Sequence, residues 1–130
     1  MTIELQYLTY VALFTTLMWP PYILNGIAVR GLTDAVGYPQ NPQPLDAWAS
    51  RLKAAHYNAV ENLVVFASLV LVAHVIGVSN PVTVLAVKAY FFARIVHALV
   101  YSAAVPWLRT LSFAVSWLAL IALAVQILSD

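Results

Sequence analysis

The chain has 130 residues, of which 63% are hydrophobic and only 8% are charged, and its mean hydropathy is +0.87. This composition lies outside that of soluble domains and predicts an integral membrane protein. The net charge of +1 argues against nucleic-acid binding, and the absence of cysteine excludes disulfides, thiolate metal sites and cysteine nucleophiles.

Four segments of the chain are long and apolar enough to cross a bilayer, which takes about 20 residues in a helix. They run from about Ile3 to Val29, Ala47 to Ile76, Pro81 to Ala104 and Trp107 to Leu128. Together they account for nearly the whole sequence. We therefore expect an all-α fold, with residues 1–130 forming one four-helix membrane domain.

The first segment has the length of a signal peptide but differs from one in composition. It opens with Glu4, has no basic residues at its start, and carries Pro20 and Pro21 where small residues would precede a cleavage site. Proline removes a backbone donor and kinks a helix. We expect a helix of the mature protein, kinked near these prolines.

The connection from about Gly31 to Asp46 contains Pro39, Pro42 and Pro44, which predicts a loop without regular helix. The first and third connections are flanked by basic residues, namely Arg30, Arg51, Lys53 and Arg109. The second connection has none. Cytoplasmic loops collect Lys and Arg. Both termini are therefore predicted to face away from the cytoplasm.

Polar residues form a stripe along each of the two central segments. At about 100° per residue, four of them in the second segment fall within roughly a third of the helix circumference: Arg51, Asn58, Glu61 and Asn62. In the third segment, Arg94, His97 and Tyr101 share a face at i, i+3 and i+7. Ionised groups inside a membrane are energetically unfavourable, so both stripes are functional candidates.

One interpretation of the stripes is purely structural, with Glu61 neutralising Arg94 or Arg51 in a buried pair that fixes the helix register. The number of polar groups favours a ligand pocket instead. Arginine binds carboxylates through its bidentate fork, Glu61 suits a cationic group, and Asn58 both donates and accepts. A zwitterionic, peptide-like ligand matches this set of groups.

Two motifs in the chain resemble those of the MAPEG family, the membrane-associated proteins of eicosanoid and glutathione metabolism. The stretch from Arg51 to Asn62 is similar to the family's second-helix signature, an arginine followed by Ala-His-x-Asn-x-x-Glu. The stretch from Ala93 to Tyr101, followed by Pro106 to Arg109, resembles its third-helix motif and the arginine that opens the fourth helix. The resemblance is to bacterial-type microsomal glutathione transferases.

This resemblance implies a homotrimer in the bacterial inner membrane, with glutathione as cosubstrate bound between subunits towards the cytoplasm. It implies a lipophilic second substrate and a role in detoxification. The three histidines of the chain are scattered, so no metal site is expected. The implied glutathione-binding residues lie mainly on the two stripes: Arg30, Arg51, Asn58, Glu61, Asn62, Arg94, His97 and Tyr101. The implied catalytic residues are Arg109, which would stabilise the thiolate, and Tyr101, which would donate a hydrogen bond to the sulfur.

The chain departs from the family pattern at three positions. Ala54 and Tyr57 stand where basic residues are common, which leaves less positive charge for the peptide. Asn62 stands where the leukotriene-making synthase has tyrosine, so that specificity does not transfer. A non-catalytic glutathione- or lipid-binding trimer and a small transporter remain as alternatives, although a transporter would need an isolated mid-membrane acid, and Glu61 has basic neighbours.

Overall fold

The computed structural model describes all 130 residues and consists of helices and their connections. The helices in chain order are α1 (Ile3–Leu17), α2 (Trp19–Arg30), α3 (Leu32–Val36), α4 (Ala47–Ile76), α5 (Pro81–Ser102) and α6 (Pro106–Leu128). Four spans are long and apolar enough to cross a membrane, with α1 and α2 acting as one. The predicted all-α, four-span membrane architecture is confirmed, and the trimer stays a prediction.

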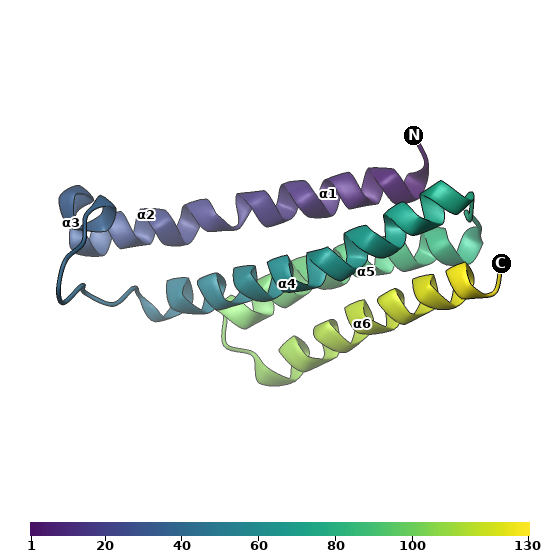
Figure 1. The fold of residues 1–130 in the computed structure, drawn as a ribbon. Coiled ribbons are helices and arrows are strands. Elements are labelled where there is room, and N and C mark those ends of the chain that lie inside the picture. Colours follow the sequence, from purple (N-terminus) through teal and green to yellow (C-terminus); the bar gives the residue numbers. More distant parts are fainter.

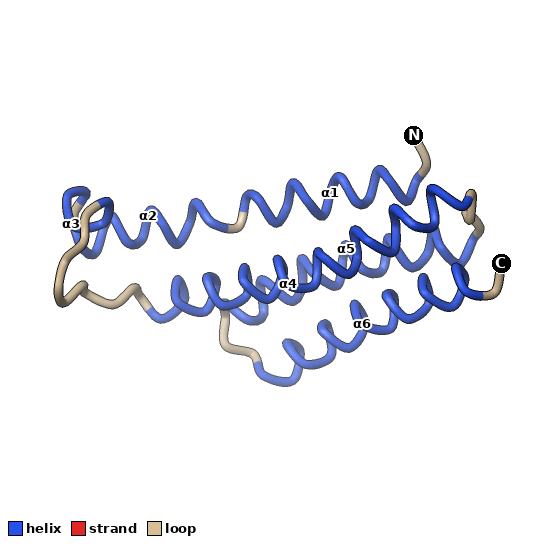
Figure 2. Tube along the Cα trace, viewed as in Figure 1, coloured by secondary structure: helices blue, strands red, loops and turns tan.

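The first span is divided at Met18, between α1 and α2 (Figure 2). Pro20 and Pro21 have no backbone N–H, so neither can continue the hydrogen-bond ladder of α1. The N–H of Met18 donates instead to the Thr15 carbonyl, at 3.3 Å, in a tighter final turn. The helix is therefore interrupted beside the two prolines, at Met18.

The prediction that the connection from Gly31 to Asp46 has no regular helix is wrong in its first part. The five residues of α3 form a short helix directly after Gly31, whose φ of +81° turns the chain away from α2. The first proline of the connection, Pro39, comes only after α3 has ended. Proline restricts its own backbone and that of the residue before it. Residues 32–36 lie outside that range and form a short helix.

Hydrogen bonds fasten the rest of this connection to the bundle. The Asn25 side chain donates to Oδ2 of Asp46 at 2.7 Å, and its own Oδ1 accepts from the Asp46 N–H at 3.0 Å. Arg30 Nε donates to the Gln43 carbonyl at 2.6 Å. The start of α4 is therefore held against α2.

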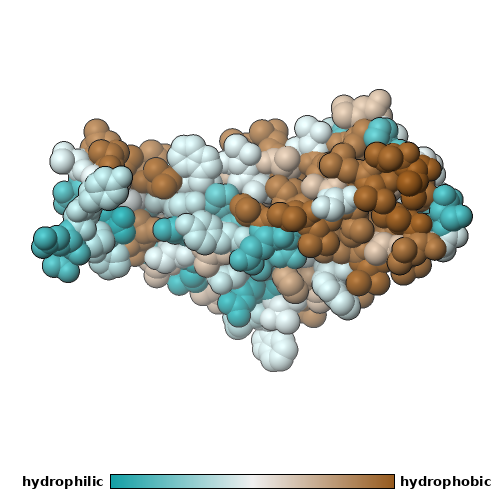
Figure 3. All heavy atoms as spheres, viewed as in Figure 1, coloured by the Kyte–Doolittle hydropathy of each residue, from teal (hydrophilic) through white to brown (hydrophobic).

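The helices differ in length, and the difference is concentrated at one end of the bundle (Figure 1). At 1.5 Å per residue, the 30 residues of α4 span about 45 Å and the 22 of α5 about 33 Å, against a hydrocarbon core of about 30 Å. The end formed by α2, α3 and the start of α4 thus extends past α5 and α6. Hydrophilic side chains gather over this end, whereas apolar ones cover the end that holds both termini (Figure 3).

The apolar core lies in the half of the bundle nearer the termini. Phe66 of α4 stacks on Tyr90 of α5 with ring centroids 4.0 Å apart. Further towards the polar end, Ala55, Ala59 and Ala98 are buried in a second cluster. Small residues let helices approach closely, so the polar stripes of α4 and α5 are held next to each other.

A strained residue closes the α5–α6 connection. The N–H of Val105 donates to the Val100 carbonyl and that of Ala104 to the Tyr101 carbonyl, which is the hydrogen-bond pattern of a Schellman motif. Glycine usually occupies the left-handed position of this motif, but here Ala104 does so, with a φ of +60°.

We predict that Ala104→Gly stabilises the protein by about 1 kcal/mol, since glycine removes the left-handed strain of roughly 1–2 kcal/mol. Ala103→Gly, one residue earlier at a φ of −80°, should destabilise it by about 0.4–1 kcal/mol through unfolded-state entropy alone. Thermal unfolding of both variants in detergent measures the difference. Equal effects at the two positions would show that Ala104 carries no strain.

Candidate functional site

Two cavities meet where α5 ends and α6 begins. The first has a volume of about 200 Å³ and is lined by Arg51, Tyr101, Ala104, Val105, Pro106 and Arg109. The second has a volume of about 210 Å³ and is lined by Asn58, His97, Tyr101, Arg109, Thr110 and Phe113. Tyr101 and Arg109 line both cavities, so the two predicted catalytic residues stand between them.

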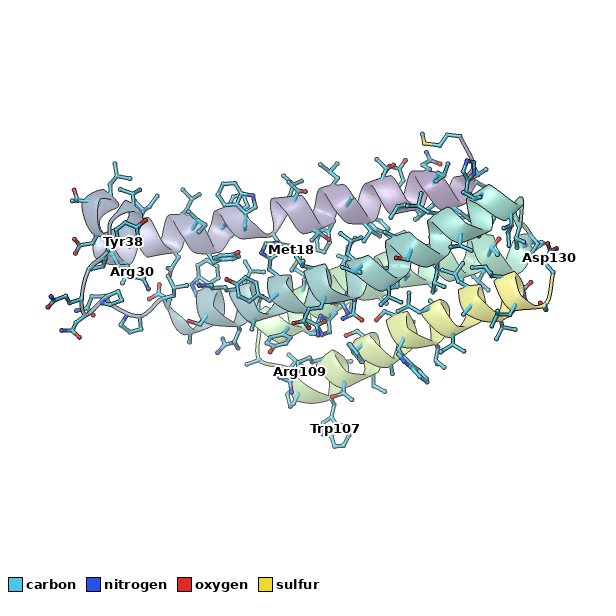
Figure 4. All side chains as sticks on the ribbon, in the orientation of Figure 1. Met18, Arg30, Tyr38, Trp107, Arg109 and Asp130 are labelled. Atoms are coloured by element: carbon cyan, nitrogen blue, oxygen red, sulfur yellow. The ribbon has the colours of Figure 1, made fainter.

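The side chains of Tyr101 and Arg109 are in direct contact. Arg109 Cζ lies 5.0 Å from the centroid of the Tyr101 ring, within the range of a cation–π interaction. Tyr101 is on the last turn of α5 and Arg109 on the first turn of α6, and the tight connection brings them together. Trp107 points away from the other helices (Figure 4).

His97 borders the second cavity from one turn before Tyr101. Its ring packs edge to face against that of Tyr101, with centroids 5.5 Å apart, and lies 6.2 Å from the Phe113 ring. The side chain is buried, and its Nδ1 has no hydrogen-bond partner within the chain. His97 therefore supplies both an aromatic wall and an unused polar atom next to Tyr101.

Arg94 is the most buried charged residue of the two stripes, with 3% of its surface exposed. Its Nη2 donates to Oδ1 of Asn58 at 2.6 Å. Nε and Nη1 are buried without a partner. A guanidinium in this state has unused donors inside the bundle, and an anionic group would satisfy them.

The amide of Asn58 connects this arginine to the second cavity. Because Oδ1 of Asn58 accepts from Arg94, its Nδ2 remains available as a donor. Asn62 turns back towards Asn58, its Nδ2 donating to the Asn58 carbonyl at 2.9 Å. Asn58 thus lies in the cavity wall, whereas Asn62 supports it from the following turn.

Arg51 reaches the first cavity from the other side. Its Nε donates to the Ser102 carbonyl at 2.8 Å, near the C-terminal end of α5. Arginine commonly binds these unpaired final carbonyls of a helix. With Arg94 bonded to Asn58 and Arg51 to Ser102, and with Glu61 exposed, the interpretation of a buried Glu61 ion pair is not supported.

Four predicted site residues line neither of these cavities in the single chain. Arg94 and Asn62 are hydrogen-bonded to Asn58, whereas Arg30 and Glu61 lie apart from it. Arg30 is at the α2–α3 end, well separated from Arg109 (Figure 4), and lines a different cavity of about 80 Å³ together with Lys53. Glu61 lies on the exposed surface of α4, three residues after Asn58. Both are placed where they would act only through a bound ligand or a neighbouring subunit.

The sequence reasoning missed the part of the site that α6 contributes beyond Arg109. Thr110 follows Arg109 directly, and Phe113 stands one turn later, at i+4. Helical spacing from Arg109 is the signal that would have placed Phe113 on this face. Ala104 and Val105 could not be found in this way, because they line the first cavity only through the geometry of the connection.

An apolar groove runs between α5 and α6. It has a volume of about 340 Å³, and all but one of its lining residues are hydrophobic: Ala89, Phe92, Ala93, Val96, Leu108, Leu111, Ser112 and Val115. Leu108 directly precedes Arg109 in the chain. A surface of this kind suits a lipophilic molecule arriving from the bilayer.

A model of the MAPEG family matches residues 7–129. The chain belongs to the MAPEG family. The matched range contains both polar stripes and Arg109, so the resemblance seen in the two motifs is confirmed. Searches of curated proteins and of solved structures give no match. MAPEG proteins include glutathione transferases and peroxidases, and this membership agrees with the four apolar spans.

The pairing of Arg94 with Asn58 leads to a prediction about stability. Asn58→Ala should lower stability by about 2–4 kcal/mol, because it leaves a buried guanidinium without its acceptor. Arg94→Met should leave stability nearly unchanged, since an apolar side chain in place of the buried charge no longer requires a hydrogen-bond acceptor. The measurement is thermal unfolding in detergent.

Asn62→Ala is the matched control for that comparison. It removes an amide one turn further along α4 that bonds to the Asn58 backbone, and we expect a loss below about 1 kcal/mol. If Arg94→Met lost as much stability as Asn58→Ala, the arginine itself would be a structural element of the bundle.

Proposed function

We propose that this MAPEG protein is a membrane-bound glutathione-dependent transferase or peroxidase. The observation that carries the proposal is the contact between Arg109 and Tyr101, both of which line the two cavities. Membership of a family that includes such enzymes supports it.

The groups around the cavities fit the functional groups of glutathione. The tripeptide carries two carboxylates, one ammonium group and a thiol. Arg51 and Asn58 offer donors for carboxylates. Arg94 lines neither cavity and contributes by holding Asn58 through its hydrogen bond. Each cavity is smaller than the roughly 300–1,000 Å³ typical of ligand pockets. In our proposal the tripeptide therefore extends through both, past Tyr101 and Arg109.

The chain's residues would then activate the thiol. A free thiol with a pKa of about 8.5 is mostly protonated at neutral pH, and only the thiolate is strongly nucleophilic. Arg109 would favour the thiolate through its charge, and the Tyr101 hydroxyl would donate a hydrogen bond to the sulfur. The thiolate would form a C–S bond with the carbon of a lipophilic electrophile, by addition or by displacing a leaving group. With a lipid hydroperoxide it would attack the terminal oxygen and break the O–O bond, giving the lipid alcohol and glutathione sulfenic acid, which a second glutathione would convert to the disulfide with release of water. The groove between α5 and α6 offers such a substrate a route from the bilayer.

The positions of Glu61 and Arg30 support a site completed by a second subunit. Both lie away from the two cavities of their own chain, and Glu61 is exposed on a helix that has wide apolar surfaces. We propose a homotrimer in which glutathione binds between subunits. The flanking basic residues support placing this end at the cytoplasmic face.

The first experiment is a glutathione titration of the detergent-purified protein, following the ultraviolet absorbance of the thiolate and the proton released on binding. A saturable thiolate signal is the expected result. Binding without that signal would favour the non-catalytic binder, and the absence of binding would leave a lipid ligand or transport as the role of the polar stripes.

Arg109→Ala should lower the thiolate signal at neutral pH by several-fold, up to about tenfold, while leaving glutathione binding largely intact, because the lost cation raises the thiol pKa by about one unit. Lys88→Ala, which removes an exposed cation from α5, is the control and should match the wild type. Unchanged thiolate absorbance in Arg109→Ala would refute the role given to this residue.

Glu61→Gln should weaken glutathione binding itself by about tenfold or more, since it replaces a charged acceptor for the ligand's ammonium group with a neutral one. Isothermal titration calorimetry measures the affinity. Asp130→Asn removes an exposed carboxylate from the opposite end and should bind normally. Equal affinities of wild type and Glu61→Gln would remove Glu61 from the site.

A further inference from the structure

A single cation lies on an exposed apolar face of α5, outside the site described above. Lys88 is exposed and belongs to a span that is apolar enough to cross a membrane. Leu85 and Phe92, about one turn before and after it, are 67% and 56% exposed. An ionised side chain on such a face is energetically unfavourable in hydrocarbon unless it reaches the interface or an anionic partner.

The depth of Lys88 follows from the hydrogen bonds that join the starts of α1 and α5. Thr83 and Ser79 donate to Glu4 Oε1 at 2.6 and 2.9 Å, so both helices begin at the end of the bundle that holds the termini (Figure 1). Lys88 is seven residues after Pro81, the first residue of α5. Its Cα therefore lies about 10 Å from this end, inside a hydrocarbon core about 30 Å thick.

Helix geometry inclines the Lys88 side chain towards the nearer membrane surface. Each Cα–Cβ bond of an α-helix tilts towards the N-terminus of the helix, and the N-terminus of α5 is at this end of the bundle. Lysine has a long apolar stem that lets its ammonium group reach the interface from such a position. The charge is therefore directed towards the headgroups of one leaflet.

A second donor lies at the same depth on α1. Tyr10 is seven residues after Ile3, the first residue of α1, and is 39% exposed. Its ring centroid is 5.9 Å from that of Phe91, which follows Lys88 by about one turn on α5. Gln6 Nε2 donates to the Tyr10 hydroxyl at 2.8 Å, so the hydroxyl hydrogen can be donated to another acceptor. The two helices thus offer an ammonium group and a hydroxyl donor at one level.

The acidic residues of the chain are not placed to neutralise Lys88. Glu4 is buried and is already bonded to two hydroxyl groups. Glu61 lies fifteen residues before the end of α4, about 22 Å from the same end of the bundle. In subunits that cross the membrane in one direction, it would be about 12 Å deeper than Lys88. The other acids lie at the polar end or after α6: Asp34, Asp46 and Asp130.

We propose that Lys88 and Tyr10 bind the phosphate group of an anionic phospholipid in the leaflet nearest the termini. The ammonium group supplies a charge-assisted hydrogen bond, and the Tyr10 hydroxyl supplies a second one to the phosphate oxygens. Phe92, one turn deeper, offers an exposed apolar surface to an acyl chain. An anionic headgroup is favoured over a zwitterionic one because it balances the lysine charge. This site is independent of the proposed glutathione chemistry.

The test measures lipid affinity of the detergent-purified protein by native mass spectrometry, with phosphatidylglycerol as the anionic lipid and phosphatidylcholine as the zwitterionic one. We expect tighter binding of phosphatidylglycerol to the wild type, and a loss of about fivefold in Lys88→Gln, the contribution of one lysine near an anionic surface. Lys88→Arg keeps the charge and should bind as the wild type does. Tyr10→Phe should show a smaller loss, because it removes one hydrogen bond.

Two control variants separate this site from general attraction of anionic lipid to basic residues. Lys53→Gln removes an exposed cation at the opposite end of the bundle, and Asp130→Asn removes an exposed carboxylate after α6. Both should keep the wild-type preference for phosphatidylglycerol. Equal affinities of the wild type and Lys88→Gln, or an equal loss in Lys53→Gln, would overturn the proposal. Unchanged affinity in Tyr10→Phe would remove the hydroxyl from the site.

Discussion

The hydrogen bond between Arg94 and Asn58 is the interaction that positions the polar residues of the site. Hydrocarbon offers no hydrogen-bond partners, so a charged side chain inside a membrane bundle must find them in the protein. Here one bond of 2.6 Å joins the polar faces of α4 and α5 and places Asn58 in a cavity wall. The remaining donors of Arg94 are buried and have no partner within the chain.

The position of the site follows from unequal helix lengths. At the polar end of the bundle, α2 and the start of α4 extend beyond the C-terminal end of α5. The carbonyl of Ser102 at that end of α5 accepts a hydrogen bond from Arg51. The connection then reverses within three residues by means of the left-handed Ala104. Reversal at this point brings the first turn of α6, with Arg109, against Tyr101. The cavities therefore form at the step between short and long helices.

The sequence was sufficient for features that depend on hydropathy and helical periodicity. It predicted the four spans, the division near Pro20 and the shared face of Arg94, His97 and Tyr101, because each follows from local residue order. It failed for α3, where five residues formed a turn of helix ahead of Pro39. It also could not place Arg109 against Tyr101, because that contact depends on the dihedral angles of the connection.

The departures from the MAPEG pattern have a structural counterpart. Ala54 and Tyr57 are both exposed, so the positions where relatives carry basic residues face outward rather than into the cavities. Lys53 lies 5.7 Å from the ring of Tyr57 and lines a cavity that it shares with Arg30. Positive charge at the polar end is thus supplied by α2 and the start of α4. Arg30 and Lys53 line a cavity separate from the one that Arg51 lines, so the positive charge of this end is divided between two places.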